Sequence, residues 1–539
     1  GRQPMTTAEG KPRPQSPPGT GRQLDRSCGG LAGAGATGLA LASGRQPAGS
    51  TGVSIEAQLT EDLTDDQRKA AEAFADWLTS PADGTPFVLS GFAGSGKTFL
   101  SMRLLRQVEA SGLCWTVVAP THKAVGVLRQ ALELEGLQPT WYPSTIHRLL
   151  RLKLKRSADA EVCEPTEQTG MALENLGLVL IDEASMVDST LLGIALQCAH
   201  PFKTRLVFVG DPAQLPPVGE DSSPVFAMQR ACVATLEEVV RHQGPVLQLA
   251  SRLRDGGLPC QNPPALPPIC NDSGQVRCLP QKDWLDQARQ ALRQASLQDN
   301  PDAARILCYT NRTLERLVPL ARRAIHGDMA DQMAVLPGEV LISRAAVMAP
   351  ASRDGEETGE EPDMVLGSNR EVTVRDVTPE SCDLMDFGLS PADGAVPVIE
   401  TLSAQVSAGE LELCLRLQPP VGSEARRELD GVMQRLRQQA RDAGKQNGRA
   451  IWRRYFLLRD AFASLGPAAV LTVHRSQGSS FGEVFVAPDV FRADPSIRQQ
   501  LCYVAVSRAR TGVWLIGGTT SSAIERAWRH EFASSLSDP

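Results

Sequence analysis

The chain has 539 residues, enough for about three or four domains, and the composition of an ordinary globular protein. Its net charge of −7 and pI of about 5.7 argue against a generally basic nucleic-acid coat, but they permit a locally basic groove. No apolar span of roughly 18 residues and no signal peptide is found, so we expect neither a membrane segment nor a membrane partner. The twelve cysteines are scattered without a C-x-x-C pair, which favours reduced thiols in a cytoplasm.

The N-terminal residues 1–57 are rich in Gly, Pro, Ala and Ser and show no periodicity, which predicts a disordered tail. Order is predicted to begin at Leu63, where Thr64 is suited to cap a helix that continues through Trp77. The amide of Gln67 in this helix could bind adenine through one donor and one acceptor. An ordinary surface glutamine is the alternative.

A glycine-rich segment follows the apolar run at 87–89 and fits the phosphate-loop pattern G-x-x-x-x-G-K-[ST]. A helix is predicted directly after it, so several backbone N–H groups would point at a polyphosphate from the helix N-terminus. Lys97 would contact the β- and γ-phosphates, and the Thr98 hydroxyl would ligate Mg²⁺. The residues of this predicted ATP-binding loop are Gly91, Phe92, Ala93, Gly94, Ser95, Gly96, Lys97 and Thr98.

A second predicted strand, Cys114–Ala119, ends in polar residues that include Thr121 and His122. Polar groups at the carboxyl ends of parallel strands lie where ligands bind. His122 and the later His147 could equally be capping or core histidines. Basic and apolar residues then alternate, which predicts a hairpin over 148–163 with one cationic face. That hairpin is either a nucleic-acid contact or a solvated ribbon.

The segment Gly177–Ile181 is predicted to be a buried strand that ends in two carboxylates. Asp182 would hold Mg²⁺, and Glu183 would polarise an attacking water molecule. Paired acids at the end of an apolar strand would be costly unless a cation or a water needs them. After the next predicted strand, Leu206–Val209, the side chain of Gln214 could sense the γ-phosphate.

The pattern changes in the middle of the chain. A helix is predicted from Leu236 to Arg254, with Arg241 as either a cationic finger or a surface arginine, and residues 256–280 are predicted to be loop. A second strand-to-helix unit opens at 305–312. From about residue 336, short β-like runs separated by turns suggest a small inserted barrel.

A helical block is predicted from Glu424 to Ser464. It holds ten Lys/Arg against four Asp/Glu between positions 424 and 459, which indicates either a nearby phosphate backbone or a solvated amphipathic helix. The strand predicted at 470–473 then runs into a polar turn. A helix predicted at 500–509 carries Arg508, and a last strand is predicted at 513–517.

Taken together, these motifs resemble those of the superfamily 1B DNA helicases of the RecD/Dda-like group. One motif alone would indicate little beyond an NTPase, whereas the ordered set is highly specific. Arg475 and Ser507 stand where Lys and Thr are frequent in the family, and both keep the chemical type. The motifs, from residue 63 to 517, are Gln67, GFAGSGKT, APTHKA, STIHR, LVLIDEASM, VGDPAQLPPVG, LEEVVRH, CYTNR, LTVHRSQG and YVAVSRAR.

The resemblance implies an α/β fold with two RecA-like P-loop domains built on parallel sheets. It also implies a small β-hairpin inserted in the first domain and a small β-barrel with a helical region inserted in the second. The expected divisions are 1–57 (tail), 58–232 (first domain, with a pin-like hairpin at 148–163), 233–335 (second domain, first part), 336–465 (inserted barrel and basic helices) and 466–539 (second domain, closing part).

The resemblance further implies an ATP-dependent helicase that moves 5′ to 3′ on single-stranded DNA and unwinds duplexes in repair, recombination or replication, in a bacterial cytoplasm or nucleoid. ATP and Mg²⁺ are the implied cofactors. The implied partners are single-stranded DNA and junctions of single- and double-stranded DNA, with a single-strand-binding protein or recombination factors as further candidates. An RNA helicase and a non-catalytic adaptor are the alternatives, although the predicted catalytic residues are all present.

The resemblance assigns roles to four sets of residues. The catalytic set is Lys97, Glu183, Gln214, Arg241 and Arg508. Gln67, Gln477 and Gly478 join the phosphate loop in binding the nucleotide, and Thr98 and Asp182 hold the metal. The residues implied to touch single-stranded DNA are Thr121, His122, His147, Thr472 and His474.

Overall fold

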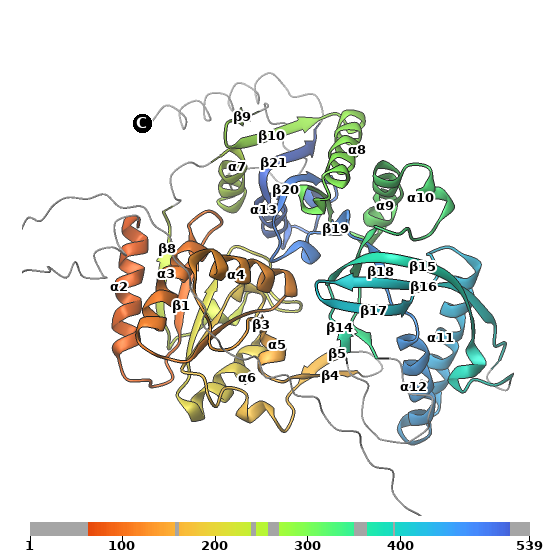
Figure 1. The fold of residues 1–539 in the computed structure, drawn as a ribbon, viewed down its shortest axis with the longest axis horizontal. Coiled ribbons are helices and arrows are strands. Elements are labelled where there is room, and N and C mark those ends of the chain that lie inside the picture. Colours follow the sequence, from red (N-terminus) through yellow and green to blue (C-terminus); the bar gives the residue numbers. More distant parts are fainter. Residues whose placement is uncertain are drawn as a thin grey trace, which may run out of the picture. The chain divides into compact units, whose positions relative to one another are not determined.

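The computed structural model describes residues 63–156, 161–238, 244–256, 269–349, 364–391 and 394–517, which all belong to one unit of the chain, Glu56–Pro539 (Figure 1). The predicted tail at 1–57 and Arg241 lie outside these residues. None of the helices in the described ranges has the length and apolar character needed to cross a membrane.

The first sheet is parallel throughout and has the strand order β3-β2-β6-β7-β1-β8. Its central strands are continuous apolar runs because helices cover both faces, as is usual for parallel sheets. The carboxyl ends of these strands therefore form one edge, where the predicted site lies. The strands are β1 (Phe87–Gly91), β2 (Trp115–Ala119), β3 (Ser144–Thr145), β6 (Leu178–Ile181), β7 (Arg205–Gly210) and β8 (Cys232–Leu236).

Alternate residues of these strands point to opposite faces. Leu89 and Val209 pack under helices α2, α3 and α4, whereas Val88 and Phe208 pack under α5 and α6. Helix α2 starts as predicted. The side chain of Thr64 accepts from the Gln67 N–H, and the Gln67 side chain accepts from the Thr64 N–H, which together form a capping box. The helices are α2 (Asp65–Thr79), α3 (Lys97–Ala110), α4 (His122–Glu135), α5 (Ile146–Leu149) and α6 (Ser189–Ala199).

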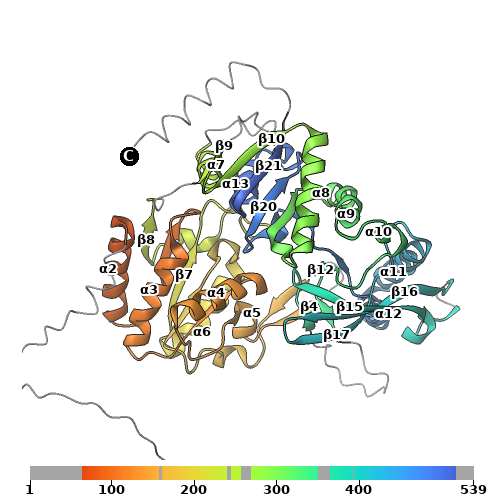
Figure 2. The same ribbon diagram turned by 45° about the horizontal axis from the view of Figure 1, so that its top comes forward.

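The predicted hairpin is shorter than the range 148–163. Residues Ile146–Leu149 form α5, so the antiparallel pair consists only of β4 (Lys153–Arg156) and β5 (Glu161–Glu164). The Thr145 side chain accepts from the Arg148 backbone and starts this helical turn, which explains why strand alternation begins later. Glu161 forms an ion pair of 2.6 Å with Arg459 on helix α12, and Figure 2 shows β4 beside the third sheet. A strand-separating role for this hairpin stays a prediction.

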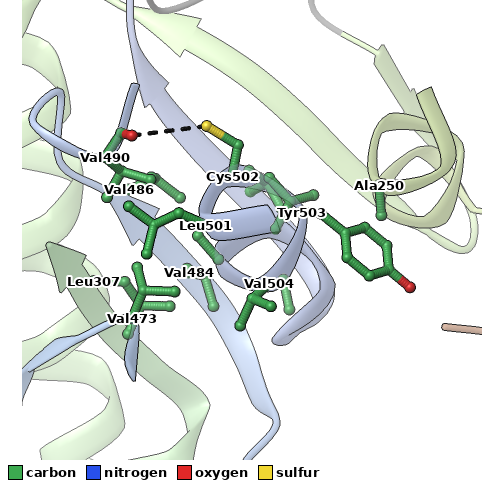
Figure 3. Packing of buried hydrophobic residues seen from close by; sticks show 14 of the residues in the cluster. Ala250, Leu307, Val473, Val484, Val486, Val490, Leu501, Cys502, Tyr503 and Val504 are labelled. Atoms are coloured by element: carbon green, nitrogen blue, oxygen red, sulfur yellow. Dashed lines mark hydrogen bonds between the residues drawn. The ribbon is translucent and has the colours of Figure 1, made fainter. Parts of the chain in front are cut away.

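The second sheet has the order β19-β11-β20-β21-β10-β9 and is parallel except for β9. Helices α7 and α13 pack on one face, against residues such as Leu307 and Val484 (Figure 3). Helices α8 and α9 pack on the other face. The elements are α7 (Pro245–Arg254), β9 (Ile269–Asn271), β10 (Gly274–Leu279), α8 (Gln281–Leu297), β11 (Ala304–Cys308), α9 (Asn311–His326), α10 (Met329–Gln332), β19 (Val470–Thr472), β20 (Phe481–Val486), α13 (Arg498–Ser507) and β21 (Ala509–Ile516).

Two predictions between residues 232 and 280 were wrong. The helix predicted from Leu236 starts at Pro245, and Cys232–Leu236 is instead the edge strand of the first sheet, which runs past the division at 232/233. Proline has no N–H to donate and is favoured in the first turn of a helix, so the true start is physically sensible. Strands β9 and β10 lie in the range 256–280 that was predicted to be loop.

A third, antiparallel sheet has the order β17-β16-β15-β12-β18 and packs beside helix α11 (Figures 1 and 2). Strand β18 crosses the predicted division at 465/466. Ala463 donates to the Arg416 carbonyl and accepts from the Gln418 N–H, which joins the end of β17 to the segment before β18. A closed barrel stays a prediction. The elements are β12 (Val340–Ser343), β13 (Val347–Met348), β14 (Met364–Leu366), β15 (Glu371–Asp383), β16 (Val398–Ala408), β17 (Leu411–Arg416), α11 (Glu424–Asp442), α12 (Gly444–Asp460) and β18 (Leu465–Pro467).

Five residues, which we call the three-sheet cluster, join the parts built on the three sheets. Lys123 of α4 forms ion pairs with Asp302 (2.8 Å) and with Glu371 of β15 (3.1 Å). Arg305 of β11 pairs with the same two carboxylates, each at 3.2 Å. The ring of Phe481 lies 5.0 Å from the Lys123 ammonium and 5.3 Å from the Arg305 guanidinium.

Candidate active site

The phosphate loop connects β1 to α3, as the pattern predicts. Gly94 and Gly96 have φ angles of 82° and 79°, in the left-handed region that side chains other than glycine rarely adopt. At Gly91 a Cβ atom would lie 2.6 Å from the Ser95 hydroxyl, so the loop closes tightly on itself. A glycine-rich turn of this kind before a helix N-terminus is the geometry that binds phosphate.

Lys97 is the first residue of α3, and its ammonium donates to the Gly91 carbonyl (2.8 Å) and the Phe92 carbonyl (2.9 Å). Burial lowers the pKa of Lys97, and the positive charge of Arg508 acts in the same direction. The carboxylates of Asp211, Glu183 and Asp182 oppose this change. Charged groups carried by the first and the second parallel sheet therefore act on one amine.

Gln67 lies under the loop instead of on the surface. Its side chain is 2% exposed, and its amide donates to the Ser95 carbonyl at 3.0 Å. Its oxygen accepts from the Thr64 N–H at 3.1 Å. The residue thus braces the phosphate loop against helix α2 in this structure, and contact with adenine stays a prediction.

The two acids follow β6 as predicted. Asp182 accepts from the Glu183 N–H at 2.8 Å. Burial, together with the neighbouring charge of Glu183, raises the pKa of Asp182 to about 7, against the opposing influence of that N–H and of Lys97. Glu183 has a φ of 52°, an unusual value for a residue with a side chain, which turns the chain sharply after the strand. A divalent cation would relieve the repulsion between these two carboxylates.

The next strand end places Asp211 and Gln214 beside these acids. Asp211 is fully buried, and one of its oxygens accepts from the Ala213 N–H at 2.9 Å. Gln214 is 6% exposed and accepts from the Ser185 hydroxyl at 3.5 Å. Gly210 lets β7 approach this region, because a Cβ there would lie 3.0 Å from Ala184.

Arg508 comes from the other sheet and reaches this site. It ends helix α13, is 6% exposed, and donates to the Ser479 carbonyl at 3.2 Å. Within the described residues its buried Nε has no hydrogen-bond partner. A buried, incompletely paired guanidinium near Lys97 suits an anion placed between them. Arg241, the other predicted finger, lies outside the described residues.

Gln477 and Gly478, the nucleotide-binding residues predicted after β19, contact residues that follow strands of the first sheet. Gln477 donates to the Leu215 carbonyl at 3.2 Å. A Cβ at Gly478 would lie 2.9 Å from the Thr121 hydroxyl, so only glycine allows this approach, and its φ is 70°. Thr121 itself caps helix α4 by accepting from the Ala124 N–H. The structure therefore brings Thr121, a predicted DNA contact, against Gly478, a predicted nucleotide contact.

Arginines surround His122, a further predicted DNA contact. Burial lowers the pKa of His122 to about 4, and the positive charges of Arg370, Arg129 and Arg148 act in the same direction. These arginines come from α4, from α5 and from the turn before β15. Within the described residues none of the three forms an ion pair, and we call them with His122 the arginine surface. The exposed ring of Tyr142 lies 4.2 Å from the Arg129 guanidinium.

The other predicted DNA contacts are more scattered. Burial lowers the pKa of His147, and the charge of Asp188 opposes this change. His147 is therefore not shown to belong to the arginine surface. Thr472 is 7% exposed and accepts from the Arg475 N–H at 3.4 Å. Burial also lowers the pKa of His474, whose ring lies 6.2 Å from that of Tyr309.

The sequence interpretation missed three residues that the structure places at these sites. Tyr503 of α13 donates to Asp211 at 2.5 Å and accepts from the Ala93 N–H at 2.8 Å. Asp211 belongs to a motif that was recognised, but only its neighbour Gln214 was assigned a role. Arg370 lies in the inserted part, where no motif was aligned.

Comparison with known proteins gives two family matches. Residues 62–279 match an AAA domain, and residues 467–516 match a UvrD-like helicase C-terminal domain. The first match covers the whole first sheet and also α7, β9 and β10 of the second, and the second match covers β19, β20, α13 and β21 of the second sheet.

Three relatives and one structure are similar to the chain. The ATP-dependent DNA helicase dda of Enterobacteria phage T4 is 22% identical over 463 residues, which are 85% of this chain and 99% of that protein. The RecBCD enzyme subunit RecD of Mycolicibacterium smegmatis is 26% identical over 86% of this chain and 73% of its own length. The ATP-dependent RecD2 DNA helicase of Deinococcus radiodurans is 32% identical, but over only 32% of this chain and 22% of that protein. A crystal structure of Bacteroides Pif1 helicase with ADP-AlF3 and ssDNA overlaps 88% of this chain and 98% of its own at 14% identity, with a TM-score of 0.39.

Proposed function

Because the chain is a superfamily 1B helicase of the RecD/Dda-like group, we propose that it hydrolyses ATP to move 5′ to 3′ along single-stranded DNA and to unwind duplexes. The observation that supports this most is the meeting of charges at Lys97. Asp182, Glu183 and Asp211 approach from the first sheet, and Arg508 approaches from the second. A site divided between two lobes can close on ATP and reopen after hydrolysis, which is what a motor requires.

The residues of the site fit a Mg²⁺–ATP complex. The positive φ angles of Gly94 and Gly96 shape the loop for phosphates, and the Nε of Arg508, which has no partner among the residues that the structure describes, is available to an anion. Thr98 and Asp182 would hold Mg²⁺, which supplies charge neutralisation on the phosphates when bound.

In the reaction that we propose, Lys97 and Arg508 stabilise the charge that develops on the transferred phosphoryl group. Glu183 orients and polarises the attacking water, and Gln214 detects whether the terminal phosphate is present. These steps use groups on both lobes, so hydrolysis is expected to require that the lobes come together.

The arginine surface is the proposed contact for the DNA backbone. Three like charges without a carboxylate partner in the described residues repel one another, and a phosphodiester would relieve that repulsion. The net charge of −7 makes this local excess more significant, because the chain as a whole does not attract nucleic acid.

We expect Arg148→Ala and Arg370→Ala each to weaken binding of single-stranded DNA by roughly tenfold at low salt. Each should also reduce the slope of log affinity against log salt by about 0.7, the value for one lost phosphate contact on a single strand. Fluorescence anisotropy over a salt series would measure both quantities. Arg293→Ala, which removes an exposed arginine of α8 outside the motifs, is the matched control. An unchanged slope in both variants would remove the arginine surface from the DNA path.

The function itself is tested by unwinding assays on duplexes with either a 5′ or a 3′ single-stranded tail. We expect ATP-dependent unwinding of the 5′-tailed duplex only. Matched DNA and RNA oligomers should then be compared as activators of ATP hydrolysis. A strong preference for RNA would identify an RNA helicase, and hydrolysis without unwinding on either duplex would contradict the proposed activity.

A further inference from the structure

The hydroxyl group of Tyr503 joins three parts of the site by two hydrogen bonds. A phenol has one proton, and the structure directs it to Asp211 Oδ2 at 2.5 Å. The oxygen then accepts from the Ala93 N–H of the phosphate loop at 2.8 Å. Burial raises the pKa of Tyr503, and the charge of Asp211 adds to this effect, so the phenol keeps its proton.

The elements that carry these groups are far apart in sequence. Tyr503 belongs to helix α13 and the second sheet, whereas Ala93 and Asp211 follow strands of the first sheet. In Figure 3 the ring of Tyr503 extends away from the aliphatic side chains, with its hydroxyl at the far end. Tyr503 is 1% exposed and Asp211 is fully buried, so water cannot easily replace either bond while the lobes are together.

Each end of this bridge leads to a proposed catalytic residue. On the α13 side, Arg508 lies five residues after Tyr503, about 7.5 Å along the helix axis. On the Asp211 side, the other carboxylate oxygen accepts from the Ala213 N–H, next to Gln214. A shift of the bridge would therefore move Arg508 and Gln214 relative to Lys97.

We propose that Tyr503 is a positioning residue that locks α13 against the phosphate loop, so that Arg508 reaches ATP. The proposal rests on the proposed ATP hydrolysis and adds to it the residue that couples the two lobes. Tyr503 touches no reacting atom. It acts through Arg508, because its hydroxyl fixes the helix that presents the guanidinium.

A second contact also joins the second lobe to the phosphate loop. The guanidinium of Arg254, on α7, lies 3.8 Å from the ring of Phe92 in the phosphate loop. Gln499 of α13 also donates to the Arg254 carbonyl, so α7 and α13 approach the loop as one unit. Without the Tyr503 hydroxyl this stacking remains, and the lobes lose the bonds to Ala93 and Asp211 only.

The test is Tyr503→Phe, which keeps the ring in its apolar surroundings and removes only the hydroxyl. We expect kcat for DNA-stimulated ATP hydrolysis to fall roughly 10- to 100-fold, while KM for ATP changes less than about threefold. Tyr455→Phe, on α12, is the matched control and should match the wild type. Wild-type kcat in Tyr503→Phe would overturn the proposal, whereas no DNA-stimulated hydrolysis in the wild type would instead overturn the proposed function.

A double-variant cycle separates positioning from a merely structural role. If Tyr503 acts through Arg508, then adding Tyr503→Phe to Arg508→Ala should cost less than about a further twofold in kcat. A full multiplicative loss in the double variant would overturn the proposal. The cycle remains decisive even if Tyr503→Phe lowers the melting temperature, since a general loss of folded protein would multiply the two effects.

Discussion

Replacing Lys97 by alanine is expected to abolish DNA-stimulated ATP hydrolysis, with a loss of at least roughly 10²-fold in kcat. Lys97 is the cation at the start of α3, and carboxylates of two strand ends together with Arg508 act on its pKa. In the structure its partners are the neutral carbonyls of Gly91 and Phe92, which a phosphate would replace with a stronger bond between opposite charges.

Steady-state ATPase assays with saturating single-stranded DNA measure this prediction, and thermal unfolding checks the fold. The melting temperature should stay close to that of the wild type, because Lys97 is only partly buried and belongs to none of the apolar clusters. Lys69→Ala, on the exposed side of α2, is a control for the loss of a lysine charge. Wild-type turnover in Lys97→Ala would show that Lys97 has been assigned the wrong role.

Replacing Arg508 by alanine should lower kcat by roughly 10³-fold, the lower end of what cationic fingers contribute in phosphoryl transfer. The guanidinium is 6% exposed, and its Nε has no partner within the described residues, so it is held ready for an anion. Binding of ATP should weaken far less, because the phosphate loop on the first lobe is unchanged.

Single-turnover hydrolysis and nucleotide binding, measured separately, distinguish these two effects. Arg510→Ala is a close control, since that residue lies two positions later and is exposed. Arg508→Lys should recover little activity, because an ammonium cannot reproduce the planar donors of a guanidinium. A loss of ATP affinity as large as the loss of kcat would instead make Arg508 a general binding residue.

The sequence was most informative where both faces of a strand are covered. Leu178–Ile181 and Phe87–Leu89 are continuous apolar runs followed by motif residues; the first strand ends where predicted, and the second runs two residues further, to Gly91. Strand β8 was missed because Cys232–Leu236 is an edge strand with three exposed or half-exposed positions, followed by Glu237 and Glu238, which favour a helix by propensity.

Tyr503 shows why part of the site escaped prediction. The motif around it was recognised, but its hydroxyl acquires a role only beside Asp211, which lies 292 positions earlier in the chain. Nothing local distinguishes this tyrosine from a core aromatic residue. Arg370 is a similar case, because it is significant only once folding brings it near His122.

The ion pairs of the three-sheet cluster and the DNA contacts of the arginine surface should respond differently to ionic strength. Arg305 is 3% exposed and Glu371 21%, so dissolved ions reach these pairs less readily than they reach the arginine surface at its exposed member, Arg148. Raising the concentration of potassium chloride should therefore detach a bound strand well before it loosens the joints between the parts of the enzyme. A salt titration would therefore separate the release of DNA from any loosening of the protein itself.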